Sequence, residues 1–223
     1  MNDPVSPQTG SRATRAVLAG TAVAAWFTTQ WLLATRGFPQ DIGDEVHRLL
    51  APANAWLAGH PGATNSLLIV TSGFIDVLGC FLLLAGILGQ SVRPFLGLML
   101  LFVLRQVSQV LTALPPPAGM IWRYPGVPSL FVTYGTGNDF FFSGHTAIAV
   151  YGAIELARFR RRWLTVAGGV VAVIEATTVL ALRAHYTMDV FTAVLAAAWA
   201  ANVAVRWAPA CDRALARLRL SRA

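Results

Sequence analysis

Apolar residues form six long runs along this chain, and short polar or charged clusters separate them. The runs cover residues 16–35, 66–88, 95–114, 144–157, 163–182 and 189–207. A helix that crosses a bilayer needs roughly 20 mostly apolar residues. The pattern therefore predicts an all-α fold, a polytopic membrane protein with six transmembrane helices. The fourth run is short, so we expect its N-terminal end to extend as a helix at the membrane surface.

The breaks between the runs carry residues that end helices. Pro115, Pro116 and Pro117 follow the third run, and a proline run cannot continue a helix. The first run has no small-residue cleavage site after it, which favours a retained helix over a removed signal peptide. We expect a single membrane domain over 1–223, with a polar tail (1–15), a six-helix core (16–207) and an arginine-rich tail (208–223).

Composition agrees with a membrane protein. Hydrophobic residues make up 56% of the chain, mean hydropathy is +0.58, and charged residues are 12%, about half the share in a typical soluble domain. The net charge is +7, and every basic residue is arginine. These arginines flank apolar runs instead of forming one stripe, so the sequence argues against a nucleic-acid partner.

The positions of the arginines predict the orientation in the membrane. Most lie on one side of a six-helix topology: Arg12, Arg15, Arg93, Arg158, Arg160, Arg161, Arg162 and those from Arg206 to Arg222. Arg36, Arg48 and Arg123 fall on the other side. Since positive charge stays in the cytoplasm, we expect a multi-pass protein of the plasma (inner) membrane with both termini cytoplasmic. Loops 37–65 and 115–143 and the turn 183–188 then face the outer or periplasmic side.

Two histidine motifs fall on that outer side. Asp139 begins the first, which continues through Ser143, Gly144 and His145 to the start of the fourth run. The second joins the fifth and sixth runs and reads His185-Tyr186-Thr187-Met188-Asp189. Topology brings the two motifs to one membrane face, although they are far apart in sequence.

These residue types suit phosphoryl chemistry. A carboxylate four residues after His185, at Asp189, can orient the imidazole on a helical turn and support its positive charge. A facing His145 can protonate a leaving alkoxide and deprotonate an acceptor. Gly144 lets backbone approach a phosphate, and a helix that starts there favours an anion. A zinc site would need a third ligand that the motifs lack, so we expect no metal and no cofactor. His47 and His60 are expected to be interfacial.

With these motifs the chain resembles the sphingomyelin synthase branch of the type 2 phosphatidic acid phosphatase (PAP2) superfamily. The family's Ser-Gly-His-Thr matches residues 143–146, with Asp139 at the expected spacing, and its His-Tyr-Thr-x-Asp-Val matches residues 185–190. Arg105 and the prolines after the third run resemble the end of the family's third helix. Gly137 and Asn138 replace a Cys-Gly pair, and Val179 stands where the phosphatases have an arginine.

The resemblance implies transfer of a phospholipid headgroup. His185 would attack the phosphorus, Asp189 would orient it, and His145 would protonate the departing diacylglycerol. A lipid alcohol such as ceramide or diacylglycerol would then take the group from the phosphohistidine. The alternatives are a PAP2-type lipid phosphatase or phospholipase C-like hydrolase that uses water, and a catalytically silent scaffold. The partners are membrane phospholipid and lipid-alcohol substrates in the bilayer; the oligomeric state stays open, a homo-oligomer included.

Further residues are candidates for binding substrate. They are Arg183, Arg105, Ser143, Gly144, Asp139, Tyr186 and Glu175. Because a charge inside the bilayer normally faces a partner or a cavity, we expect Arg105 to pair with Glu175 or Asp76 beneath the site. Tyr134, Trp122 and Tyr186 are candidates for an aromatic cage around a quaternary ammonium.

Overall fold

The computed structural model describes residues 42–132, 134 and 140–220, with side chains to residue 217, and also Thr21, Ala24, Ala25, Phe27 and Thr28. The chain divides into two units, Met1–Gly43 and Asp44–Ala223, and the candidate site lies in the second. The first expected run, 16–35, falls almost wholly outside the described residues. That helix and the single-domain organisation stay predictions.

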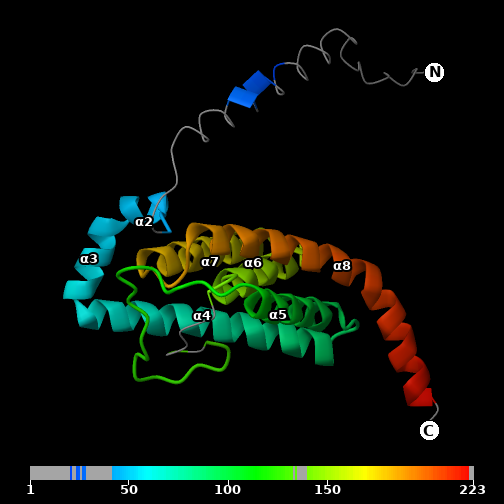
Figure 1. Ribbon diagram of the computed structural model, residues 1–223. Helices are drawn as coiled ribbons and strands as arrows, with labels where there is room; N and C mark the ends of the chain where they lie inside the picture. The colour runs from blue at the N-terminus through cyan, green and yellow to red at the C-terminus, as the bar shows by residue number, and fades with distance from the viewer. Residues whose placement is uncertain are drawn as a thin grey trace, which may run out of the picture. The chain divides into compact units, whose positions relative to one another are not determined.

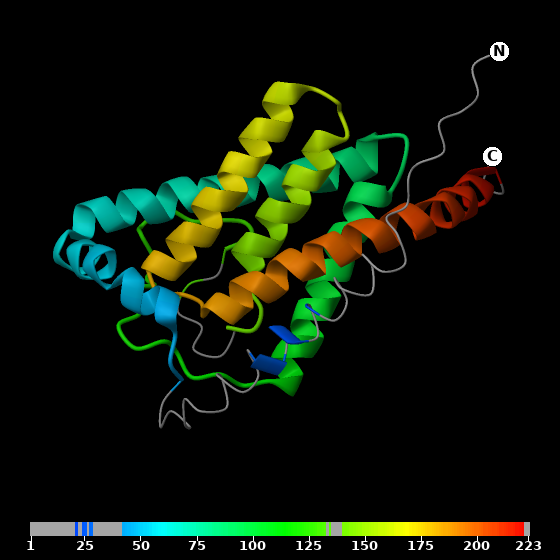
Figure 2. The same cartoon turned by 90° about the horizontal axis from the view of Figure 1, so that it is seen from above.

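The second unit is helical, and its described part contains no strand. Its helices are α2 (Glu45–Leu49), α3 (Ala51–Gly59), α4 (Pro61–Leu88), α5 (Arg93–Leu111), α6 (Gly144–Ala157), α7 (Arg162–Ala181) and α8 (Thr187–Leu220). Figures 1 and 2 show α4 to α8 as one bundle, with α2 and α3 at one end. The predicted all-helical class is confirmed.

Four described helices, α4, α5, α7 and α8, are long and apolar enough to cross a membrane. Helix α6 has 14 residues, which is short of the length a bilayer requires. The expected count of six transmembrane helices is therefore not confirmed. The expected surface extension before α6 is also absent, because Ser143 caps the helix and is itself buried.

Helices α5 and α8 end at other residues than the sequence pattern predicts. Helix α5 ends at Leu111, and Thr112 has an extended backbone, since a residue close before a proline run is pushed out of helical geometry. Helix α8 continues past the expected end at 207 and through Pro209. The arginine-rich tail is thus part of a helix as far as it is described.

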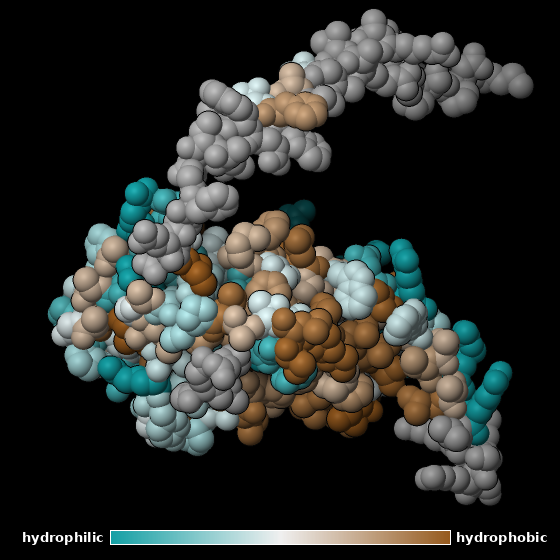
Figure 3. Space-filling view, viewed as in Figure 1, coloured by the Kyte–Doolittle hydropathy of each residue, from teal (hydrophilic) through white to brown (hydrophobic). Residues whose placement is uncertain are grey.

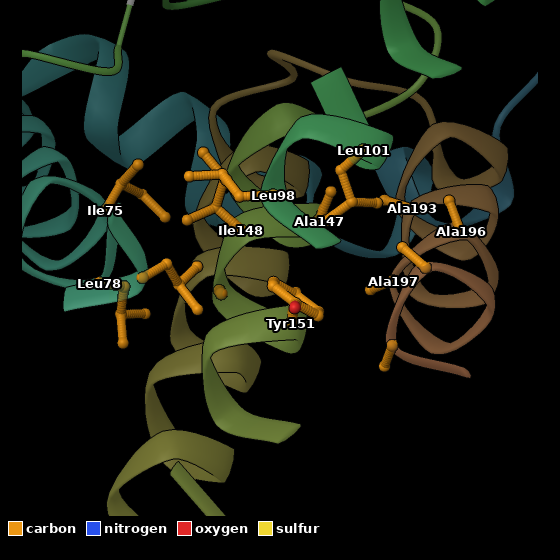
Figure 4. Close-up of a cluster of buried hydrophobic side chains, with 14 of the residues drawn as sticks. Ile75, Leu78, Leu98, Leu101, Ala147, Ile148, Tyr151, Ala193, Ala196 and Ala197 are labelled. Carbon is orange, nitrogen blue, oxygen red and sulfur yellow. The ribbon is translucent and has the colours of Figure 1, made fainter. Parts of the chain in front are cut away.

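The core forms where α4, α5, α6 and α8 meet. Helix α8 contributes a row of fully or almost fully buried alanines: Ala193, Ala196, Ala197, Ala200 and Ala201. Small side chains let neighbouring helix backbones approach closely, and Figure 4 shows Ala193, at one end of this row, beside Leu101 and Ala147. Close approach also requires Gly97, because a Cβ there would lie 2.0 Å from the hydroxyl oxygen of Tyr151.

Apolar side chains cover the outside of the bundle. In Figure 3, hydrophobic residues form a continuous area over its middle, while polar residues gather toward α2 and α3 and along the C-terminal part of α8. Large apolar residues such as Val77, Val103 and Val166 are more than 60% exposed. A lipid-facing surface has this composition, which agrees with the apolar spans.

Candidate active site

Both motif histidines line one cavity of about 390 Å³. His145 lies in the first turn of α6, and His185 lies in the turn between α7 and α8. The rest of the wall comes from α4, α5, α6, the segment between α5 and α6 and the turn after α7: Ile75, Phe102, Arg105, Gln106, Trp122, Phe131, Phe140, Gly144, Ile148 and Ala184. The structure thus brings together the two histidines that the motif positions placed on one face.

A backbone carbonyl fixes the tautomer of His185. Its Nδ1 lies 2.8 Å from the carbonyl oxygen of Phe140. A carbonyl can only accept, so Nδ1 carries the proton in the neutral ring and Nε2 keeps a free lone pair. His185 is 7% exposed. A buried imidazole with a lone pair on Nε2, in a cavity wall, has the form in which a histidine can act as a nucleophile.

Asp189 lies close to this ring but does not orient it in the way that the spacing suggested. Its Oδ2 accepts a hydrogen bond from the backbone N–H of Tyr186 at 2.8 Å and is 3.6 Å from Nδ1 of His185. The Asp189 carboxylate therefore caps the start of α8 by accepting the N–H of the residue before the helix, as the acidic residue of a capping box does. The Phe140 carbonyl orients the imidazole ring of His185, and the Asp189 carboxylate places a negative charge beside that ring.

His145 faces the same cavity from the start of α6. It is 9% exposed, and its Nε2 makes no hydrogen bond to the described part of the chain. The Trp122 ring meets it edge to face, with the ring centroids 5.1 Å apart. Ser143 caps α6 by accepting from the N–H of Thr146, and its own N–H donates to the carbonyl of Asp189. One serine therefore joins the two histidine motifs.

Arg105 is the one arginine among the described residues that lines the cavity. Its Nε donates to the carbonyl of Phe142 at 2.9 Å. A Cβ on Gly144 would lie 3.2 Å from that Nε, so the glycine leaves room for the guanidinium. From the sequence, Gly144 was expected to let the backbone approach a phosphate. In the structure, the missing side chain leaves space for Arg105 beside the start of α6.

Two expected substrate-binding residues point away from the cavity. The guanidinium of Arg183 donates to the carbonyls of Ala118 and His47. Tyr186 stacks on the His47 ring and donates its hydroxyl to the carbonyl of Pro115. Neither side chain is in the cavity wall. The structure therefore gives both residues the role of holding the turn around His185, in place of the expected contact with phosphate or headgroup.

Asp44 and His47 were not recognised as site residues from the sequence. Asp44 accepts from the N–H groups of Val46 and His47 at the start of α2 and from the N–H and hydroxyl of Thr187 at the start of α8. Burial works to raise the pKa of Asp44, but the hydrogen bonds from Thr187 and His47 outweigh it and leave the pKa below its usual value. An acidic residue before a short amphipathic stretch is a capping signal, and it could have indicated this contact.

His47 was expected to be interfacial, and the structure shows that this is wrong. The side chain is 7% exposed, and its Nε2 lies 2.9 Å from the carbonyl oxygen of His185. Asn54 on α3 donates to the carbonyl of Ala181 nearby. Helices α2 and α3 thus hold the turn that carries His185, a long-range contact for which the sequence offers no periodic pattern.

Within the described part of the chain, neither Glu175 nor Asp76 forms the expected ion pair with Arg105. Glu175 is fully buried, and neither of its carboxylate oxygens has a hydrogen-bond partner. Asp76 accepts from the Ser129 hydroxyl and from the N–H groups of Leu130 and Phe131. Asp76 therefore anchors the loop that covers the cavity, and Glu175 lies outside the cavity wall.

The expected aromatic cage is formed only in part. Trp122 and Tyr134 stack with centroids 5.3 Å apart, while Tyr186 packs on the other side of the turn. Trp122 faces the cavity together with Phe102, Phe131 and Phe140. Asp139, the remaining expected site residue, lies outside the described residues. Among the described side chains, no group of three His, Cys, Asp or Glu residues is placed to hold a metal ion.

Comparison with known proteins shows which family this chain matches. The model of the AtPDCT1/2 family matches residues 41–206. The phosphatidylcholine:diacylglycerol cholinephosphotransferase 1 of Arabidopsis thaliana is 24% identical over 175 residues, which cover 74% of this chain and 53% of the relative. The chain thus spans about half the length of that relative.

A solved structure shares the fold. The crystal structure of Aquifex aeolicus LpxE matches with a TM-score of 0.54 and 17% sequence identity, over 76% of this chain and 96% of the other. The PAP2 resemblance stated from the two histidine motifs is confirmed at the level of the superfamily. The chain belongs to the AtPDCT1/2 family, within the PAP2 superfamily.

Proposed function

We propose that this protein is a headgroup phosphotransferase that moves phosphocholine from phosphatidylcholine to a lipid alcohol through a phosphohistidine. The observation that carries the proposal is the hydrogen bond from His185 Nδ1 to the Phe140 carbonyl. It leaves Nε2 as the nucleophilic atom in a cavity that His145 also lines.

The reaction proceeds in two balanced steps. The His185 Nε2 lone pair attacks the phosphorus, an N–P bond forms, and the P–O bond to diacylglycerol breaks. His145 gives a proton to the departing oxygen, since a phosphodiester anion bound beside it favours the protonated imidazole. The acceptor hydroxyl then returns a proton to His145 and attacks phosphorus, and the N–P bond breaks. The Asp189 carboxylate stabilises the positive charge on His185 in both steps.

Other parts of the cavity suit the two ends of the headgroup. Arg105 is the cation of the wall and can pair with the phosphate oxygens. Trp122, Phe102, Phe131 and Phe140 present aromatic rings, and the described wall contains no carboxylate. Aromatic rings attract a trimethylammonium group, whereas a primary ammonium would require acceptors. These features favour phosphocholine over phosphoethanolamine, and they agree with the named activity of the Arabidopsis relative.

The acceptor and the location are also part of the proposal. The name of the relative favours diacylglycerol, with ceramide as the acceptor that the resemblance to sphingomyelin synthases suggested. If water is the acceptor, the protein is a hydrolase that uses the same cavity. The arginine distribution favours cytoplasmic termini and a cavity on the outer face of the inner membrane.

A transfer assay in nanodiscs tests the proposal. Purified protein receives phosphatidylcholine with labelled choline and a diacylglycerol of distinct mass, or ceramide, and the lipids are followed by mass spectrometry. We expect labelled phosphatidylcholine of the new mass with the wild type and none with His185→Asn. His60→Asn is the matched control, because His60 is exposed and stacks on Trp56 away from the cavity. Label released as water-soluble phosphocholine would identify a hydrolase, and equal activity of both variants would contradict the mechanism.

A further inference from the structure

A second cavity lies away from the histidine site, where the α4–α5 turn meets the end of α6. Its volume is about 550 Å³. Its wall combines two arginines, one buried glutamate, two small polar side chains and apolar surface: Phe81, Ala85, Gly89, Gln90, Ser91, Arg93, Pro94, Glu155, Arg158 and Phe159. Because α4 ends and α5 begins here, the cavity opens where two spans end.

The charged groups of this cavity are held in fixed positions. Glu155 is 2% exposed, and its two oxygens accept from Nε and Nη2 of Arg93 and from Nε of Arg158. The backbone of Arg93 is fixed as well: its N–H donates to the Ser91 hydroxyl, and its carbonyl accepts from Tyr151. Ordering two arginines normally costs side-chain entropy on binding, and here the fold has already ordered them.

The cluster has more positive charge than the glutamate needs. One arginine would neutralise Glu155, so two leave a net charge of about +1 in the wall. Glu155 takes three N–H donors, while each guanidinium carries several more in a planar fork. The side chains of Arg93 and Arg158 are 31% and 36% exposed, so these donors can be reached.

We infer that this cavity binds the headgroup of an anionic phospholipid in the leaflet on the arginine-rich side. The phosphate meets the forks of Arg93 and Arg158, and Ser91 and Gln90 face the polar part of the headgroup. Phe81, Ala85 and Phe159 line the path of the acyl chains. Basic pockets between helices at a membrane surface have the charge and shape that such lipids require. The site is separate from the transfer chemistry and does not depend on the proposed function.

Lipid retention in nanodiscs tests this inference. The protein is placed in dioleoylphosphatidylcholine with a rising share of dioleoylphosphatidylglycerol, and bound lipid is measured by native mass spectrometry beside the melting temperature. The wild type should retain one phosphatidylglycerol saturably and gain stability with its share. Arg158→Gln should weaken retention about tenfold by removing one charged fork. Arg158→Lys keeps the charge but not the planar guanidinium, so its retention should lie between that of the wild type and that of Arg158→Gln.

Arg161→Gln is the matched control, since Arg161 is exposed in the same segment and does not line the cavity. It removes the same charge and should leave retention unchanged. Equal losses in Arg158→Gln and Arg161→Gln would overturn the site in favour of a diffuse surface field. The wild-type protein alone also tests the idea if a variant fails to fold. No preference for phosphatidylglycerol would refute it, and so would equal stabilisation by inorganic phosphate in pure phosphatidylcholine nanodiscs.

Discussion

Asp189→Asn separates the charge of this residue from its structural contact. The carboxylate Oδ2 accepts the Tyr186 N–H at 2.8 Å and lies 3.6 Å from His185 Nδ1. An asparagine oxygen can keep the first interaction, but it has no charge for the second. The His185 tautomer should also survive, because the Phe140 carbonyl still accepts from Nδ1.

The separation of the two groups sets the size of the effect. Both side chains are at least nine-tenths buried, so solvent screens their interaction only weakly. At 3.6 Å and an effective dielectric constant of about 20, a unit charge pair interacts by about 4–5 kcal/mol. Positive charge on His185 develops only when it attacks phosphorus, so the loss falls on the transition state. We expect the rate of phosphohistidine formation to fall by about 10³-fold with little change in KM.

Single-turnover kinetics in nanodiscs with labelled phosphatidylcholine measures this rate directly. The melting temperature shows whether the variant remains folded. Asp212→Asn is the matched control, because Asp212 also accepts a backbone N–H, that of Val92, and does not line the histidine cavity. A rate within about threefold of wild type in a folded Asp189→Asn protein would refute an electrostatic role and leave Asp189 as a helix cap. A changed KM at unchanged kcat would assign it to substrate binding instead.

Four further substitutions or conditions have defined outcomes. His47→Leu should destabilise the protein by about 1–3 kcal/mol and lower transfer, because the buried His185 carbonyl loses its donor; a thermal melt and the transfer assay check both. Gly97→Ala should cost about 1–3 kcal/mol, since the new Cβ meets the Tyr151 hydroxyl, and an unchanged melt would show that the helices can separate freely. Glu175→Gln should keep transfer and leave stability equal or higher, because it removes an unpartnered buried carboxylate; loss of transfer in a folded variant would give Glu175 a part in the chemistry. Because the fold lowers the pKa of Asp44, ionised Asp44 stabilises the fold fully at pH values above the usual pKa of 3.8. This stabilisation is lost as the pH falls below 3.8 and Asp44 is protonated in the folded state. Asp44→Asn should therefore flatten the fall in stability below about pH 4, as measured by melts across pH.

The sequence by itself determined the apolar helices and the two motifs. Runs of about 20 apolar residues needed no partner to be recognised. Helices α5 and α7 follow them within a few residues, while α4 begins earlier, at Pro61, and α8 continues to Leu220. The positions of the two motifs also predicted that His145 and His185 share one face, and the structure places both in the wall of one cavity. Even the short α6 was placed correctly from Gly144 to Ala157, although its burial inside the bundle was not expected.

The tertiary structure alone decided which groups surround His185. The Phe140 carbonyl accepts the hydrogen bond from Nδ1 that the spacing had assigned to Asp189. A backbone acceptor leaves no mark in a side-chain pattern. His47 and Asp44 reach the His185 turn across more than 130 residues, and Arg183 turns away from the cavity for carbonyls in distant segments. Hydrophobic periodicity is local and reports which face of a helix is buried. Hydrogen bonds between distant loops depend on where the packed helices place those loops, and only the folded chain contains that information.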